Sequence, residues 1–160
     1  MKLSLHAVGR MKKGPERELF ARYFDRATAS GKQQSIQPFI LKEYSESKAQ
    51  RAADRKRQEA DEILANIDKS AMVIALDERG KTLSSPDFAS MIERYRDDGA
   101  KELVFIIGGA DGLDETIRNR AQRLVAFGAM TWPHQIVRIL AAEQIYRSIS
   151  ILSNHPYHKA

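Results

Sequence analysis

The sequence contains no cysteine. This absence excludes disulfide bonds, thiolate zinc sites and cysteine nucleophiles, and it suits a reducing compartment. Long apolar runs are lacking too, since no stretch approaches the roughly 20 residues that a membrane-spanning helix requires. Charges return at Arg10, Lys12 and Lys13, so the opening residues are too short for the apolar core of a signal peptide. We therefore expect a cytoplasmic protein with no membrane partner.

Several common binding and catalytic motifs are also missing. The Gly-Gly-Ala-Asp-Gly stretch at 108–112 lacks the spacing of the Rossmann fingerprint, and no Gly-Lys-Ser/Thr follows it as in a P-loop. There is no Gly-x-Ser-x-Gly, which excludes the common serine-hydrolase elbow. His155 and His158 are three residues apart, but no further ligands complete a zinc site, so we expect no metal.

The composition is that of one globular domain. The 160 residues are 42% hydrophobic, which is enough to bury a core, and no repeat, linker or low-complexity segment divides residues 1–160. Lysine and arginine number 26 against 21 aspartates and glutamates, so the formal net charge is +5. This mild basic excess permits a phosphate-rich partner such as RNA without demanding one.

Hydrophobic periodicity predicts strands that alternate with helices. The expected strands are 2–8, 36–44, 71–76 and 102–107, and the expected helices are 15–29, 47–68, 85–98 and 135–152, with a further helical segment after residue 112. Pro38 favours an edge position for the second strand. The runs at 71–76 and 102–107 are almost wholly apolar, as in strands covered on both faces. This pattern predicts an α/β fold with a mostly parallel sheet flanked by helices.

Three segments are expected at the carboxyl ends of strands, where parallel sheets bind ligands. They are Leu76 with the polar turn 77–81, the pair Gly108 and Gly109, and residues 130–131. The glycine pair permits close approach of a ligand to the backbone, although such a pair is often only a turn. At this stage both interpretations stay open.

The last helix begins beside a histidine. His134 follows a proline, at the start of the predicted helix. Its imidazole suits a helix cap, a base or an RNA contact, and equally a packed side chain. Within the helix, Glu143 and Arg147 are four residues apart, the spacing of an intrahelical ion pair. The charged segment 48–57 of an earlier helix is either an RNA-contacting face or a solvated surface.

Five spaced motifs occur in one order along the chain. They are 105–112 (Phe-Ile-Ile-Gly-Gly-Ala-Asp-Gly), 130–134 (Met-Thr-Trp-Pro-His), Arg138, 143–147 (Glu-Gln-Ile-Tyr-Arg) and 155–159 (His-Pro-Tyr-His-Lys). With these motifs the whole chain resembles the RlmH family, bacterial 23S rRNA (pseudouridine-N3)-methyltransferases of the SPOUT superfamily. The resemblance implies a SPOUT-type sheet with a carboxyl-terminal trefoil knot, which is an exception to the usual unknotted topology.

The same resemblance implies a function and its partners. The expected reaction is S-adenosylmethionine-dependent methylation of N3 of a pseudouridine in 23S rRNA, on the assembled ribosome. A homodimer is implied, in which both protomers build each active site. Two alternatives stay open: a non-catalytic ribosome-binding or assembly module that retains the fold, and an enzyme that uses another nucleotide ligand.

The resemblance also implies roles for individual residues. The cofactor-binding positions are Leu76, Gly108, Gly109, Phe127, Gly128, Ala129, Met130, Thr131 and Trp132. The catalytic candidates are His134, Glu143, Tyr157 and His158, and the choice of general base among the two histidines and the glutamate stays open. The candidates for RNA binding are Arg138, Arg147 and Lys159. We expect the tail 155–159 to contact RNA and handle protons rather than to pack.

Overall fold

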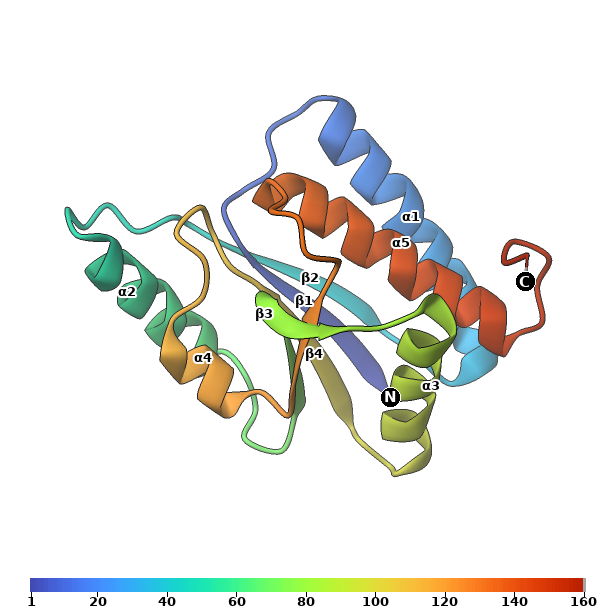
Figure 1. The fold of residues 1–160 in the computed structure, drawn as a ribbon. Coiled ribbons are helices and arrows are strands. Elements are labelled where there is room, and N and C mark those ends of the chain that lie inside the picture. The colour runs from blue at the N-terminus through green and yellow to red at the C-terminus, as the bar shows by residue number, and fades with distance from the viewer. Residues whose placement is uncertain (160) are drawn as a thin grey trace.

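The computed structural model describes residues 1–159 (Figure 1). Its strands are β1 (Lys2–Val8), β2 (Phe39–Tyr44), β3 (Met72–Thr82), β4 (Glu102–Ile107) and β5 (Arg123–Ala126). Its α-helices are α1 (Pro15–Gly31), α2 (Ala52–Ala65), α3 (Ser85–Asp97), α4 (Glu115–Arg120) and α5 (His134–Leu152), and a short 3₁₀ helix spans Lys32–Gln34. Strands and helices alternate along the chain, as the periodicity predicted.

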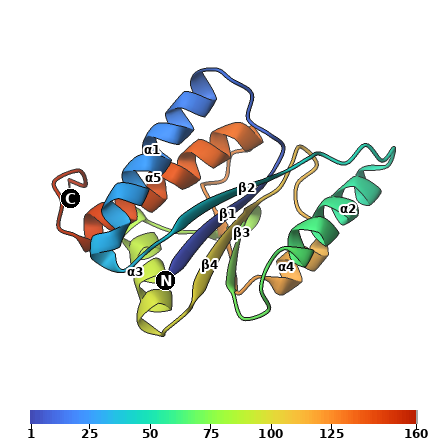
Figure 2. The same ribbon diagram turned by 180° about the vertical axis from the view of Figure 1, so that it is seen from behind.

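The five strands form one sheet in the order β2-β1-β4-β3-β5, and every neighbouring pair is parallel. Helices α1, α3 and α5 cover one face, and α2 and α4 cover the other (Figures 1 and 2). The predicted α/β architecture is therefore confirmed. Because all strands run in one direction, their carboxyl ends meet at a single edge of the sheet.

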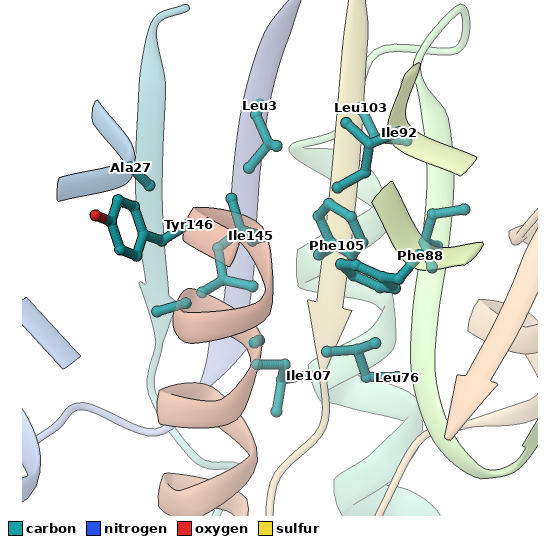
Figure 3. Close-up of a cluster of buried hydrophobic side chains, with 14 of the residues drawn as sticks. Leu3, Ala27, Leu76, Phe88, Ile92, Leu103, Phe105, Ile107, Ile145 and Tyr146 are labelled. Carbon is teal, nitrogen blue, oxygen red and sulfur yellow. The ribbon is translucent and has the colours of Figure 1, made fainter. Parts of the chain in front are cut away.

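Each face of the sheet has its own apolar core, because successive strand side chains point to opposite faces. On one face Leu3, Leu103 and Phe105 pack under α3 and α5, and the Phe105 ring lies 5.6 Å from that of Phe88 (Figure 3). On the other face Val104 and its neighbours pack under α2 and α4. Burial on both faces explains why β4 is apolar at every position after Glu102.

Two predicted elements have different bounds in the structure. Strand β2 is at the edge, as Pro38 predicted, but it begins only at Phe39. Helix α2 begins at Ala52 instead of residue 47, because the Ser47 amide donates to the Glu59 carboxylate at 3.0 Å. Ser47 therefore lies beside the helix, as part of the connection that precedes it.

A polar turn was expected at 77–81, but in the structure these residues belong to β3. The strand continues through an irregularity: Leu76 and Lys81 both pair with Val125 of β5. Strand β5 itself has four residues and was not located individually from the sequence. Its pairing on both sides of the irregularity brings the segment 77–80 close to the edge where the strands end.

Candidate active site

A cavity of about 270 Å³ opens at the carboxyl ends of β3, β4 and β5. This volume is close to the lower end of the range for small-molecule pockets, about 300–1,000 Å³. The three predicted loops meet here, and eight of the nine predicted cofactor-binding residues line it: Leu76, Gly108, Gly109, Phe127, Gly128, Met130, Thr131 and Trp132. Ala129 does not line the cavity but lies within the same exposed loop. Three segments that are separate in sequence, around residues 76–79, 107–113 and 125–132, thus line the same cavity.

Apolar and charged side chains share the cavity wall. The apolar part comes from strand ends, from the connection between β4 and α4, and from α5: Leu76, Ile107, Leu113, Val125 and Val137. The charged part includes Lys56 of α2, Asp77 of β3 and Arg118 of α4. Apolar side chains beside a few charged groups suit a ligand with both an apolar ring and a charged end.

Asp77 and Arg118 connect the wall segments to each other. Arg118 Nη1 donates to Asp77 Oδ2 at 3.3 Å and to the Leu113 carbonyl at 2.6 Å, while Asp77 Oδ1 accepts from the Arg79 amide at 2.8 Å. The network fixes the irregular part of β3 against the segment that follows the glycines. Sequence reasoning missed Arg118, because nothing in a short charged helix indicates a partner 41 residues away.

The glycine pair is required by the fold of its own loop. A Cβ on Gly108 would lie 2.8 Å from the Gly112 carbonyl carbon, and one on Gly109 would lie 3.0 Å from Val8 Cγ1 of β1. The Gly112 amide closes the turn on the Gly109 carbonyl at 3.0 Å. The steric need for glycine therefore comes from inside the protein, and the expected close approach of a ligand is not needed to explain it.

Helix α2 holds this glycine loop through an ion pair. Arg55 donates Nε to Asp111 Oδ2 at 2.7 Å and Nη2 to Oδ1 at 3.0 Å, which is a bidentate arrangement. The hydrogen bond with Arg55 lowers the pKa of Asp111. Arg55 Nη1 also donates to the carbonyls of Ala49 and Gln50 at 3.0 and 2.8 Å. Part of the charged segment 48–57 is thus structural.

The loop after β5 exposes large apolar side chains at the mouth of the cavity. Met130 is 74% exposed and Trp132 is 42% exposed. Trp132 Nε1 donates to the Phe127 carbonyl at 3.1 Å, and this bond closes the loop. Exposed apolar groups beside a cavity are typical of a surface that a ligand or another chain covers.

Of the four predicted catalytic residues, only His134 lines the cavity within the described part of one protomer. It is the first residue of α5, and its Nε2 lies 3.9 Å from Oε1 of Glu46. The ring is partly exposed toward the cavity. Position and chemistry together make His134 the protomer's own candidate for proton transfer at this cavity.

The other three catalytic candidates form a separate cluster near the end of α5. Glu143 Oε1 accepts from Arg147 Nη2 at 2.6 Å and from the Tyr157 hydroxyl at 2.9 Å. His158 Nδ1 lies 3.3 Å from Arg147 Nη1. Thirteen residues of helix separate His134 from Arg147, which is about 20 Å along the axis. The fold of the chain therefore does not bring the predicted catalytic set together.

Tyr157 of the tail packs, although RNA contact and proton handling were expected of residues 155–159 rather than packing; His155 and Pro156 are exposed. The Tyr157 ring lies 4.6 Å from the Tyr146 ring and 4.8 Å from the Arg147 guanidinium carbon, and it joins the core around α5. Burial, together with hydrogen bonds to Glu143 and Tyr23, raises the pKa of Tyr157. The phenol therefore stays protonated at neutral pH, so it is a donor and not a base. Lys159 is exposed.

Arg138 is buried, which corrects its proposed role as an RNA contact. Its exposed fraction is 1%. Nη1 donates to Glu43 Oε2 at 2.6 Å, and Nη2 donates to the carbonyls of Gly9 and Val8 at 2.8 and 3.2 Å. Burial lowers the pKa of Arg138. A guanidinium enclosed in this way has no surface to offer a phosphate, so its role is structural.

Within 1–159, no group of three or more histidine and carboxylate side chains lies close enough together to bind a metal ion. Among the helices of the same residues, none combines the length and the apolar character that crossing a membrane requires.

Known proteins match this chain over almost its whole length. The family model described as "Predicted SPOUT methyltransferase" matches residues 1–158. The chain is 50% identical over 159 residues to a Rhizobium leguminosarum protein named ribosomal RNA large subunit methyltransferase H, with 99% of each chain covered. Proteins of the same name from Mesorhizobium japonicum and Brucella anthropi are 50% and 51% identical over 160 residues, with 100% of each chain covered.

A solved structure shares the fold. It is the crystal structure of a probable methyltransferase from Bordetella pertussis, with a TM-score of 0.53 and 12% identity. The match covers 92% of this chain and 95% of that one. At this level of identity the likeness extends to the arrangement of helices and strands and not to individual site residues.

Proposed function

Because this chain belongs to the RlmH family of SPOUT methyltransferases, we propose that it methylates N3 of a pseudouridine in 23S rRNA, with S-adenosylmethionine as the methyl donor. The observation that carries the proposal is the cavity where three separate loops meet at the carboxyl ends of the strands. Near 50% identity over whole chains named as rRNA methyltransferases supports the same reaction class. This relationship favours an enzyme over an assembly module or another nucleotide enzyme.

The side chains of the cavity fit S-adenosylmethionine. The apolar wall of Leu76, Ile107 and Val125 suits the adenine ring, and Lys56 and Arg118 are cations that suit a carboxylate. The carboxylate of Asp77 lies in the same wall. When bound, this cofactor supplies a methyl group on a sulfonium that is already activated for transfer. No metal is needed for such a reaction.

The proton of the target nitrogen requires an acceptor. N3–H of pseudouridine must be deprotonated as the N3–carbon bond forms and the carbon–sulfur bond breaks. His134 is at the cavity with Nε2 near Glu46, so we assign it the role of accepting this proton. Glu143 is nine positions, about 14 Å, along α5 from His134, and His158 of the tail lies against Arg147, one turn further along the helix. Both are too far from the cavity of their own protomer to act there.

A homodimer would bring the two clusters together. In a twofold dimer each surface meets its own copy, so helices that cross the axis run antiparallel. An antiparallel pair of α5 helices would place the partner's tail cluster near this protomer's His134. Exposed Met130 and Trp132, with the partly buried Ile136 and Leu140, offer apolar surface for that contact. We therefore propose that Arg147, His158 and Lys159 act on the RNA at the partner's cavity.

We also propose that the carboxyl-terminal part of the chain forms a trefoil knot. Support comes from β5, which pairs with β3 at Leu76 and again at Lys81, on both sides of the irregularity. A Cβ on Gly80 would lie 2.5 Å from the Val125 nitrogen, so β5 passes directly against this segment. A strand that threads the 77–82 segment would hold two walls of the cavity together.

Methyl transfer to ribosomal particles tests the proposal. Purified protein and tritiated S-adenosylmethionine would be incubated with large subunits, whole ribosomes or free 23S rRNA from cells that lack this gene. We expect mass spectrometry to detect N3-methylpseudouridine, with whole ribosomes as the best substrate. Because ribosomes are in the cytoplasm, we propose that the protein acts there. His134→Ala is expected to lower the rate by about 10²-fold. Cofactor binding without transfer to any of the three substrates would instead indicate a binding module.

A further inference from the structure

The connection between β1 and α1 carries an exposed group of cations, which we call the basic loop (residues 9–14). Arg10, Lys12 and Lys13 are exposed. Within residues 1–159, none of their side chains forms an ion pair or a hydrogen bond. Three neighbouring cations without partners repel one another. A ligand with several negative charges would relieve this repulsion, and its binding would be more favourable for that reason.

The backbone of the basic loop is anchored at two points. The Gly9 amide donates to the Tyr44 carbonyl at 2.7 Å, and the Met11 amide donates to Glu43 Oε2 at 2.8 Å. The Met11 side chain is buried in the core next to α1 and α5. Arg10, Lys12 and Lys13 therefore project from a fixed backbone, and binding would not have to order it.

Arg138 connects this anchor to α5. Its guanidinium binds the Gly9 and Val8 carbonyls and the same Glu43 oxygen that accepts from Met11. One buried ion pair thus fixes the end of β1, the start of the basic loop and the last helix. The arginine that the sequence suggested as an RNA contact is instead placed to hold other cations in position.

The basic loop lies at the edge of the sheet where the cavity opens. It follows the carboxyl end of β1, and β1 pairs with β4, whose own end continues into the glycine loop. A Cβ on Gly9 would lie 3.7 Å from His134 Nε2. Figures 1 and 2 both show the connection between β1 and α1 beside the start of α5.

Carboxylates near the basic loop reduce its charge without cancelling it. Residues 10–18 contain four cations against two carboxylates, Glu16 and Glu18 in the first turn of α1. Glu43 is already paired with Arg138, and Glu46 is near His134. An excess of positive charge therefore remains on the exposed side of the loop.

We propose that Arg10, Lys12 and Lys13 bind backbone phosphates next to the target nucleotide, and that Arg138 acts as a positioning residue for this loop. The proposal rests on rRNA being the substrate. Phosphates are the RNA groups that bind such cations irrespective of sequence. A loop at the rim of the cavity would hold the strand while the target base enters.

The test compares two double variants with the same loss of charge. Lys12→Ala/Lys13→Ala removes two cations of the basic loop. Lys69→Ala/Lys101→Ala removes two exposed lysines that precede β3 and β4, at the opposite edge of the sheet. Methyl transfer to ribosomes from cells lacking the gene would give KM and kcat at several KCl concentrations, with calorimetry for S-adenosylmethionine affinity and a thermal melt.

We expect the basic-loop variant to raise KM for ribosomes on the order of tenfold at low salt, with kcat and cofactor affinity unchanged. The slope of log KM against log salt should fall by about 1.4–1.8, since each lost phosphate contact removes about 0.7–0.9. Lys12→Arg/Lys13→Arg should restore both values. The Lys69→Ala/Lys101→Ala variant should match the wild type.

The outcomes separate this proposal from the function on which it rests. If the wild type transfers no methyl group to any ribosomal substrate, the proposed function fails. If the wild type is active and both double variants have the KM and the salt slope of the wild type, the proposal that the basic loop binds phosphates is wrong. Equal weakening in the two variants would also overturn it, because net charge alone would then explain the effect.

Discussion

The Tyr44 hydroxyl and Nδ1 of His6 are 2.7 Å apart inside the sheet. Both residues are buried, and they connect β2 to β1 at a distance from the cavity. Burial lowers the pKa of His6 to about 4, with the nearby Lys42 adding to the effect. The pair is therefore stable only while the imidazole is neutral.

The first prediction is that acid destabilises the fold through His6. Its pKa is 6.5 in the unfolded chain and about 4 in the folded one, so the unfolded state binds more protons between these values. Stability is fully present above pH 6.5 and falls as the pH decreases toward 4, by roughly 2–3 kcal/mol. Urea unfolding at pH 5–7 measures this slope, and His6→Gln should flatten it. Identical slopes for both proteins would contradict the assignment.

The second prediction concerns the ion pair between Arg55 of α2 and Asp111 of the glycine loop. Arg55→Ala and Asp111→Asn each break the bidentate pair, and the loop that lines the cavity should become less ordered. We expect S-adenosylmethionine affinity to fall by no more than about fivefold, because solvent screens a partly exposed pair. The matched control is Arg57→Ala, which breaks the exposed pair with Asp61 on the same helix. Calorimetry should find the Arg57→Ala variant unchanged; equal losses in all three variants would exclude a specific role for the pair.

The third prediction identifies why residue 109 is glycine. An alanine there would place its Cβ 3.0 Å from Val8 Cγ1, so Gly109→Ala should displace the loop and weaken cofactor binding. If Val8 is the cause, Gly109→Ala/Val8→Ala should restore affinity, although the cavity left by Val8→Ala lowers the melting temperature. If the ligand itself needs the bare backbone, the double variant will bind as poorly as the single one. Isothermal calorimetry of the four proteins decides between the two causes.

The sequence predicted local features better than distant contacts. Pro38 precedes an edge strand, as predicted, because this signal depends only on adjacent backbone. Arg138 was misjudged, because its burial depends on Glu43, which is 95 residues away. A cation in an amphipathic helix looks the same in sequence whether it faces water or a buried carboxylate.

The candidate site was predictable in part for the same reason. The pattern of apolar runs placed Leu76, the pair 108–109 and residues 130–131 at one edge of the sheet, and the family resemblance implied the remaining cofactor positions. Eight of the nine positions line the cavity there. The separation of His134 from the Glu143 cluster follows from the predicted helix 135–152, because each residue adds about 1.5 Å along the axis. The contacts of the tail with Glu143 and Arg147 did not follow from the sequence, because they depend on how the chain folds back after the helix. The short β5 gave no signal of its own, because four residues are too few to display a period.

The last prediction tests whether the tail cluster serves the partner's cavity. His134→Ala removes the proton acceptor at the cavity, and His158→Ala removes an imidazole of the tail cluster. Each variant alone should be nearly inactive. In a heterodimer of the two, a shared site combines the intact cavity of one protomer with the intact tail of the other. The second site of that heterodimer carries both defects.

Random reassociation of equal amounts makes about half of the dimers heterodimers, each with one intact site. The mixture should therefore recover about a quarter of the wild-type rate of methyl transfer. Light scattering before and after mixing must show dimers that exchange subunits. If each protomer used its own tail, every site in the mixture would carry one defect and no activity would return. A mixture no more active than its components, with exchange demonstrated, would rule out the composite site and leave His134 to act with its own protomer alone.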